Sequence, residues 1–291
     1  MNSPPEDAPS LLFPRIHIRG PTHAPERVAV AREEPLEIQI GGIPMVVIMR
    51  TPGHDEDLAL GFLWGEGWVT SPDQVISIRH CTTPRSPEAE DNVILVHLHP
   101  DTPFHFEQLR RNIYTTSSCG VCGKGSIQNL CQRGPRVVSE IRVPRDVLAE
   151  LPTKLRRAQG LFAATGGVHG IGLFTVEGEL IICREDVGRH NAVDKVIGWA
   201  LRQGLLPGSP LILLVSGRVS FEIIQKALMA QIPIVAAISA PTSLAIELAE
   251  QSGITLVAFL RGETMAVYTH TWRVLPEEMD LPPLERQDTR G

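Results

Sequence analysis

The chain has 291 residues, of which 43% are hydrophobic and 21% charged, and its formal net charge at pH 7 is -6. A chain of this length can bury enough apolar surface to fold as one large domain or two smaller ones without covalent cross-links. The acidic balance argues against broad contact with nucleic acid, because a phosphate backbone requires a concentrated basic surface.

The N-terminal sequence and the cysteine content indicate the cellular compartment of the protein. Residues 1–7 lack the basic stretch and apolar core of a signal peptide, and no apolar run approaches the length of a membrane span. The cysteines number five, an odd count, and Cys119 and Cys122 are too close in sequence to brace a large fold. We therefore expect a cytoplasmic protein in which the paired cysteines have a chemical role.

The first third of the chain is expected to be rich in strands. Residues 1–25 abound in proline and polar groups, which predicts a mobile leader outside the core. Apolar alternation on both sides of Gly41 and Gly42 predicts a hairpin over 33–49. The pattern then predicts a helix over 55–68, with acidic residues at its start, and strands at 75–79 and 93–97.

The remainder of the chain is expected to form an α/β domain. Strands at 211–215, 234–238 and 254–260 alternate with helices at 220–231 and 243–251, as in a parallel sheet covered by helices. Before them, the sequence predicts a polar cysteine loop at 115–125, a helix at 151–164 ended by Gly166 and Gly167, a hairpin at 172–183 turned at Glu177 and Gly178, and a helix at 191–202.

The last three predicted strands end in similar residues. Serine, glycine and arginine follow the first strand, and a run of small polar residues follows the second; the candidate ligand residues are Ser216, Gly217, Arg218, Ser239, Thr242, Ser243 and Arg261. The carboxyl ends of parallel strands border one edge, where helix amides can hold phosphate oxygens. These residues thus predict a site for a phosphorylated ligand, whereas the alternative is that they are ordinary helix caps in strand-to-helix turns.

The segment at 114–125, YTTSSCGVCGKG, is the strongest chemical signal in the sequence. Its glycines let backbone amides approach a thiolate, and Lys124 supplies positive charge that favours the ionised, nucleophilic form of cysteine. A structural zinc site usually draws four ligands from paired knuckles, and the sequence has no second Cys-x-x-Cys. A reactive thiol at Cys119 or Cys122 is therefore favoured.

Other uses of these residue types remain open. A zinc deaminase combines His-x-Glu with Cys-x-x-Cys, and His54 and Glu56 supply the first pattern, although Ser118 stands where proline would precede the first cysteine. The isolated Cys81, Cys131 and Cys183 are interpreted as structural thiols. At one predicted strand-to-helix junction, Asp186, Arg189 and His190 could orient a thiol or a ligand, or could simply form a capped helix with a local ion pair.

Taken together, these segments resemble the formate dehydrogenase accessory sulfurtransferase family (FdhD-type proteins). The resemblance runs from about Glu33 to His270 and rests on TTSSCGVCGK at 115–124, REDVGRHNAVDK at 184–195, SGRVSFE at 216–222 and SAPTSLA at 239–245. The chain departs from the family pattern at Asp57, where glutamate is usual, and at Gln231 and Ala266. These departures leave the cysteine loop intact.

The resemblance implies a function. It implies transfer of persulfide sulfur from a cysteine desulfurase to the molybdenum cofactor of formate dehydrogenase, in its bis(molybdopterin guanine dinucleotide) form, with GDP as a fragment ligand. Cys119 is similar to the persulfide-bearing cysteine, and Cys122 would act as its partner in relay or protection. The family's cofactor-binding stretch matches Phe259, Leu260, Arg261, Gly262, Glu263 and Thr264. No resident metal site is implied.

The resemblance also implies a fold and an assembly. The expected α/β fold is a cytidine-deaminase-like layered sheet with covering helices, plus a smaller N-terminal β-rich region, and the protein is expected to form a homodimer. We expect a leader at 1–25, the β-rich region with one helix at 26–110, the sulfur-transfer and cofactor-binding domain at 111–275, and a tail at 276–291. The principal alternative function is a non-catalytic cofactor chaperone with redox-sensing cysteines.

Overall fold

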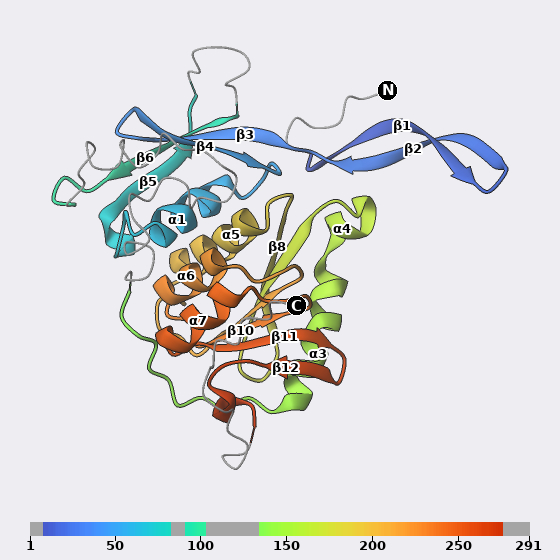
Figure 1. The fold of residues 1–291 in the computed structure, drawn as a ribbon. Coiled ribbons are helices and arrows are strands. Elements are labelled where there is room, and N and C mark those ends of the chain that lie inside the picture. Colours follow the sequence, from blue (N-terminus) through green and yellow to red (C-terminus); the bar gives the residue numbers. More distant parts are fainter. Residues whose placement is uncertain (1–7, 83–90, 103–133, 276–291) are drawn as a thin grey trace, which may run out of the picture.

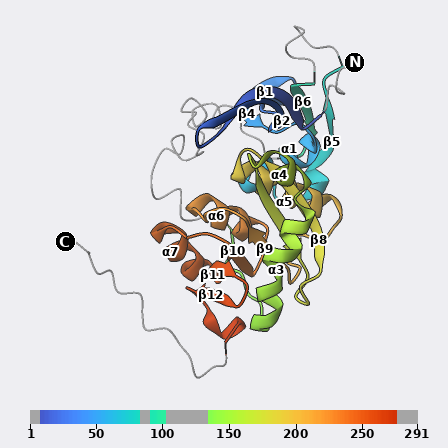
Figure 2. The ribbon, with the colours of Figure 1, turned by 90° about the vertical axis from the view of Figure 1, so that its right-hand side faces the viewer.

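The computed structural model describes residues 8–82, 91–102 and 134–275. Figures 1 and 2 show stacked layers: a four-stranded sheet, a layer of helices, a six-stranded sheet, and a helix on its far face. This is a mixed α/β fold, as the sequence predicted. Within the described residues, no helix is both long and apolar enough to cross a membrane.

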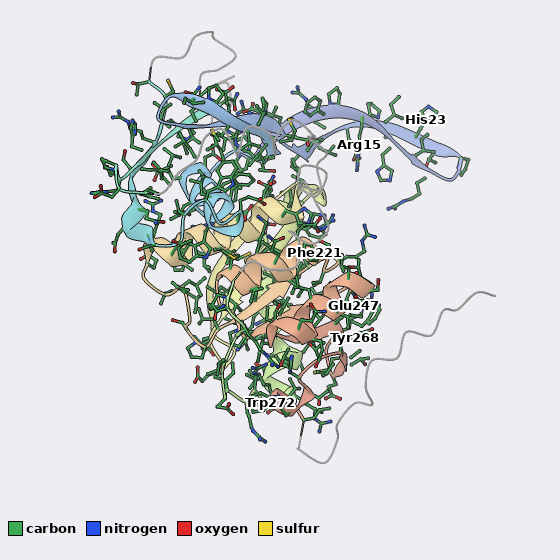
Figure 3. All side chains as sticks on the ribbon, turned by 60° about the vertical axis from the view of Figure 1, so that its left-hand side comes forward. Arg15, His23, Phe221, Glu247, Tyr268 and Trp272 are labelled. Carbon is green, nitrogen blue, oxygen red and sulfur yellow. The ribbon has the colours of Figure 1, made fainter. Side chains whose placement is uncertain are left out.

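A two-stranded antiparallel ribbon opens the described chain, formed by β1 (Ser10–Arg19) and β2 (Thr22–Ala31). It projects from the body, and Figure 3 shows Arg15 and His23 along its length. The prediction of a mobile leader over 1–25 therefore needs correction for residues 10–25, which form regular strands. They lie outside the core, as expected, because nearly all of β1 is exposed.

The four-stranded sheet has the order β4-β3-β6-β5. Its strands are β3 (Glu34–Ile40), β4 (Ile43–Arg50), β5 (Val75–His80) and β6 (Val93–Leu98). The predicted hairpin is confirmed, since β3 and β4 pair across Gly41 and Gly42, whose φ angles of 58° and 80° suit glycine. The predicted helix is α1 (Asp55–Gly65), and the short 3-10 helix η1 (Pro72–Gln74) precedes β5.

The six-stranded sheet has the order β12-β11-β10-β9-β7-β8. Strands β9, β10 and β11 are parallel, and antiparallel strands flank them, so the predicted parallel sheet and the predicted 172–183 hairpin are both confirmed. The strands are β7 (His169–Phe174), β8 (Leu180–Asp186), β9 (Ile212–Val215), β10 (Ile234–Ala237), β11 (Thr255–Arg261) and β12 (Thr264–Val267).

Helices cover both faces of this sheet (Figure 1). One face carries the predicted helices α5 (Arg189–Arg202), α6 (Phe221–Met229) and α7 (Ser243–Ser252), and the other carries α3 (Arg145–Ala158). The helix α4 (Gly160–Thr165) follows α3, and the 3-10 helix η4 (Thr271–Arg273) closes the described chain.

The single helix predicted over 151–164 was wrong, because α3 and α4 are separate. The chain leaves helical geometry at Gln159, with φ -85° and ψ 76°. The Gln159 side chain is buried against Gly170, where an added Cβ would lie 2.3 Å from its Nε2. A contact with β7 therefore sets the break, while Gly166, at φ 67°, ends α4 as predicted.

The core follows from the alternation of the central strands. Leu213 and Val215 on β9 face the helices and the four-stranded sheet, whereas Ile212 and Leu214 face α3. The buried residues on the side of the helices form one continuous cluster, which runs from Leu36 on β3 to Ala258 on β11. The two sheets therefore share one hydrophobic core. The predicted domain boundary at 110/111 lies outside the described residues.

Helices α1 and α5 touch backbone to backbone within this core. A Cβ added at Gly61 would lie 2.0 Å from the carbonyl oxygen of Asp194, and one added at Gly198 would lie 1.9 Å from that of Asp57. No real side-chain atom fits at such distances. Glycine at both positions therefore lets α1 pack directly against α5.

Candidate functional site

The predicted ligand residues meet at one edge of the six-stranded sheet. Strands β9, β10 and β11 run parallel, and β8 runs with them because both β8 and β9 are antiparallel to β7. Their carboxyl ends therefore share this edge, and Figure 3 marks it with Phe221 at the start of α6. In a parallel sheet this is the usual edge for ligands.

Backbone hydrogen bonds join the three loops at this edge. The amide of Val219 donates to the carbonyl of Ala240 at 3.1 Å, and that of Thr242 donates to Val219 at 3.0 Å. The amide of Phe259 donates to the carbonyl of Ser239 at 3.2 Å. The structure thus brings the predicted residues of 216–218, 239–243 and 259–264 side by side.

The third loop differs from the expected strand-to-helix turn. Strand β11 turns at Gly262 and Glu263 directly into β12, with Arg261 opposite Thr264. This loop therefore offers no helix amides to a ligand. Its residues Arg261 to Thr264 are exposed, and Phe259 is 40% exposed at a φ of 51°. A large aromatic face and an arginine are thus available to a ligand.

The second loop follows the alternative prediction in part. The Thr242 hydroxyl accepts a hydrogen bond from the Ala245 amide at 3.4 Å, so it caps α7. Ser243 is the first residue of that helix and is exposed. In the first loop, the Ser216 hydroxyl accepts from the Gly170 amide at 3.0 Å, while Arg218 is exposed. Arg218 and Arg261 are therefore the exposed cations of these loops.

Asp186, at the end of β8, is fully buried and saturated with donors. Its carboxylate accepts hydrogen bonds from the Gly188 amide at 2.8 Å and from Asn191 Nδ2 at 2.9 Å, and it lies 2.7 Å from Lys195 Nζ. For Asp186 the structure therefore favours the local ion pair over direct contact with a ligand.

The same carboxylate fixes the end of β4. The Thr51 amide donates to Asp186 at 3.1 Å, and Lys195 Nζ donates to the Thr51 carbonyl at 2.8 Å. Asn191 Nδ2 also donates to the Met49 carbonyl at 2.7 Å. The polar motif at 184–195 thus anchors the N-terminal region to the six-stranded sheet, beside the candidate edge.

The acidic start of α1 is paired with arginines. Arg50 donates to Asp55 at 3.1 and 2.9 Å, and Asp57 lies 3.4 Å from Arg184 and 3.0 Å from Arg202. These carboxylates were predicted to complement the helix start, and they also form buried or half-buried ion pairs. They stabilise the position of α1 against β8 and α5.

His54 precedes α1 in the left-handed region, at a φ of 60°. Burial lowers the pKa of its imidazole, and the charges of Arg184 and Lys195 lower that pKa further. Within the described residues, no group of three histidine, cysteine, aspartate or glutamate side chains could hold a metal ion. Both cysteines of the zinc alternative, Cys119 and Cys122, lie outside those residues.

Two histidines and an arginine gather beside the first loop. His169, at the start of β7, pairs with Asp186 in the strand register. A Cβ added at Gly217 would lie 3.1 Å from His169 Nδ1, so the ring lies directly against that glycine. Sequence reasoning singled out Arg189 and His190 but missed His169, because no motif surrounds it and only the antiparallel register brings it to this edge.

The cysteines are divided between described and undescribed segments. Cys119, Cys122, Cys131 and Lys124 lie outside the described residues. Cys81 and Cys183 are free thiols, and burial raises the pKa of Cys183 to about 12, with the Glu185 carboxylate raising it further. A thiol with such a pKa is not ionised at neutral pH, which agrees with the structural role predicted for Cys183.

Comparison with known proteins connects this geometry to a family. A model of the FdhD/NarQ family matches residues 31–275. The sulfur carrier protein FdhD of Nocardia farcinica is 50% identical over 248 residues, which cover 84% of this chain and 88% of that protein. The protein of the same name from Mycobacterium tuberculosis is 50% identical over 256 residues, covering 86% of this chain and 92% of that protein.

A solved structure shows the same fold. The crystal structure of a formate dehydrogenase accessory protein from Desulfotalea psychrophila matches with a TM-score of 0.72 and 25% sequence identity. The match covers 92% of this chain and 100% of the other. The two chains therefore share the overall fold.

Proposed function

The chain belongs to the FdhD/NarQ family, and from this premise we propose that it is a sulfur carrier protein required for formate dehydrogenase activity. The observation that supports this most strongly is the sequence TTSSCGVCGK at 115–124 in a chain 50% identical to proteins named sulfur carriers. In this proposal the chain is a sulfurtransferase that works through a cysteine persulfide, and Cys119 bears the sulfur.

The proposed chemistry is a pair of thiol exchanges. The Cys119 thiolate attacks the outer sulfur of a persulfide on a cysteine desulfurase; the donor's S–S bond breaks, its cysteine leaves as a thiolate, and Cys119 becomes the persulfide. Release of that sulfur as sulfide takes two electrons. Cys122 supplies them by attacking the inner sulfur and forming a disulfide with Cys119.

The proposed acceptor is the molybdenum cofactor in its bis(molybdopterin guanine dinucleotide) form. It would be bound as a substrate at the edge formed by 216–218, 239–243 and 259–264. The exposed face of Phe259 suits stacking on guanine, and the exposed guanidinium of Arg261 suits phosphate. GDP is the fragment of this cofactor that such a site would hold.

We therefore expect GDP to bind more tightly than ADP, and Arg261→Ala to weaken GDP binding about tenfold or more, because a charged hydrogen bond to phosphate is lost. Isothermal titration calorimetry on the full chain measures both. Arg79→Ala is the matched control, since it removes an exposed arginine from β5 in the other sheet. Equal, weak binding of both nucleotides, unaffected by Arg261→Ala, would remove this assignment.

The proposal extends to fold and partners. We propose that the six-stranded sheet with its covering helices has cytidine-deaminase-like layering, that the protein acts in the cytoplasm with a cysteine desulfurase and formate dehydrogenase, and that it forms a homodimer. The homodimer is supported by exposed apolar side chains on the projecting ribbon, among them Ile16 at 66% and Ile18 at 72% exposure. An isolated two-stranded ribbon is marginal in water and gains stability when a partner covers it.

A further inference from the structure

Arg189, the first residue of α5, has a guanidinium group without a counterion among the described residues. Its Nε is buried and has no hydrogen-bond partner there. The neighbouring carboxylate of Asp186 is already occupied by Lys195 and three hydrogen-bond donors. A buried guanidinium nitrogen without a partner costs free energy, and an anionic ligand would satisfy it.

Two imidazoles lie close enough to Arg189 to feel its charge. Burial lowers the pKa of His169, and Arg189 lowers it further, while the Asp186 carboxylate opposes this shift. Burial also lowers the pKa of His190 to about 4, and Arg189, Lys226 and His169 act in the same direction. Both rings are therefore neutral at pH 7, and each can donate one N–H to a ligand oxygen.

The two imidazole rings differ in whether neighbouring groups hold them by hydrogen bonds. His190 Nε2 lies 3.1 Å from the Ser220 hydroxyl and 3.7 Å from the Glu222 carboxylate, and these two groups hold the ring in place. The negative charge of Glu222 opposes an anion on that side. No hydrogen bond within the described residues holds the His169 ring, which lies against Gly217. Of the two imidazoles, His169 is therefore the one left free to bind an anion beside Arg189.

Gly217 brings the main chain directly against the His169 ring. A Cβ at Gly217 would lie 3.1 and 3.3 Å from ring atoms of His169, so any larger residue would press on the imidazole. The preceding Ser216 hydroxyl accepts a hydrogen bond from the Gly170 amide at 3.0 Å. The arrangement resembles other phosphate sites in which glycine allows close approach of the backbone.

We propose that Arg189 and His169, beside Gly217, form a binding site for a phosphate group, with His190 as a positioning residue. Resting on the proposed function, the site takes the diphosphate of the guanine nucleotide, whose base lies toward Phe259. His169 on β7 and Phe259 on β11 are three interstrand spacings apart, about 14 Å, so the nucleotide would lie extended along this edge of the sheet. Arg189 is thus a cation whose Nε is buried, whereas Arg218 and Arg261 are exposed cations.

The test uses inorganic pyrophosphate, GDP and guanosine with the full chain in isothermal titration calorimetry. Arg189→Gln is expected to weaken pyrophosphate and GDP binding about tenfold to a hundredfold and to leave guanosine binding unchanged, because a charged pair with phosphate is lost. Arg79→Gln, on the other sheet, is the matched control and is expected to change none of the three.

A second measurement avoids any loss of folding in the variant. In the unaltered protein, pyrophosphate should shift the imidazole NMR signals of His169, assigned with His169→Gln. The site is disproved if pyrophosphate leaves these signals unchanged, or if folded Arg189→Gln binds pyrophosphate as tightly as the parent. If pyrophosphate binding depends on Arg189 but guanine adds no more than adenine, the phosphate site stands and the guanine-cofactor proposal fails.

Discussion

Replacement of Cys119 by alanine is expected to abolish the rescue of formate dehydrogenase activity in a strain that lacks its own accessory protein, a loss of at least about a hundredfold. An alanine methyl group cannot form a persulfide, so no sulfur reaches the cofactor. GDP binding is expected to remain, since the candidate nucleotide residues lie on other segments. Enzyme activity in cell extracts, normalised to accessory-protein level by immunoblot, measures the effect.

Cys183→Ala is the control for this experiment. Its thiol is half-buried, and burial raises its pKa to about 12, so it should take no part in sulfur transfer and its loss should leave rescue intact. Cys122→Ala is informative in a different way, because a complete loss would make Cys122 obligatory for release. Full rescue by Cys119→Ala at normal level would favour the non-catalytic cofactor chaperone.

Gly198→Ala is expected to produce the largest loss of folding stability of any alanine substitution on α5. The new Cβ would lie 1.9 Å from the Asp57 carbonyl oxygen and 2.9 Å from the Gly61 amide nitrogen, both backbone atoms that cannot rotate away. Alanine favours a helix by about 1 kcal/mol over glycine. Separation of α1 from α5 should outweigh this gain, with a net loss of about 3 kcal/mol or more.

Thermal unfolding followed by circular dichroism measures this loss. For a chain of this size the melting temperature should fall by roughly 10 °C. Gly160→Ala is the matched control, because Gly160 is also helical and a Cβ there would meet nothing within 4 Å. Equal melting temperatures for the two variants would show that α1 and α5 do not touch as described.

Much of the fold could be predicted because periodicity is strong in the apolar segments. Strands β9, β10 and β11 and their helices lie within one or two residues of the predicted bounds, since each strand is a short apolar run between polar turns. The ribbon of β1 and β2 was not predicted, because the proline-rich composition of residues 1–25 was given more weight than the alternation of apolar and polar residues. Leu12, Ile16 and Ile18 share one strand parity, which is the pattern of a strand.

The parts that sequence could not supply depend on distant contacts. Gln159 breaks the predicted helix because of Gly170, and β11 turns directly into β12, a strand that the sequence pattern did not predict. His169 reaches the candidate edge only through its register with Asp186. Asp186 was recognised as a charged residue, but its bond to Thr51, 135 residues earlier, follows from tertiary packing alone.

The central claim is that Cys119 carries sulfur, and mass spectrometry of the protein after incubation with a cysteine desulfurase and free cysteine tests it most directly. The account predicts a gain of one sulfur atom, about 32 Da, located on the peptide that contains Cys119, removed by dithiothreitol and absent from Cys119→Ala. No added sulfur, or added sulfur found on Cys81 or Cys183 and retained in Cys119→Ala, would contradict it.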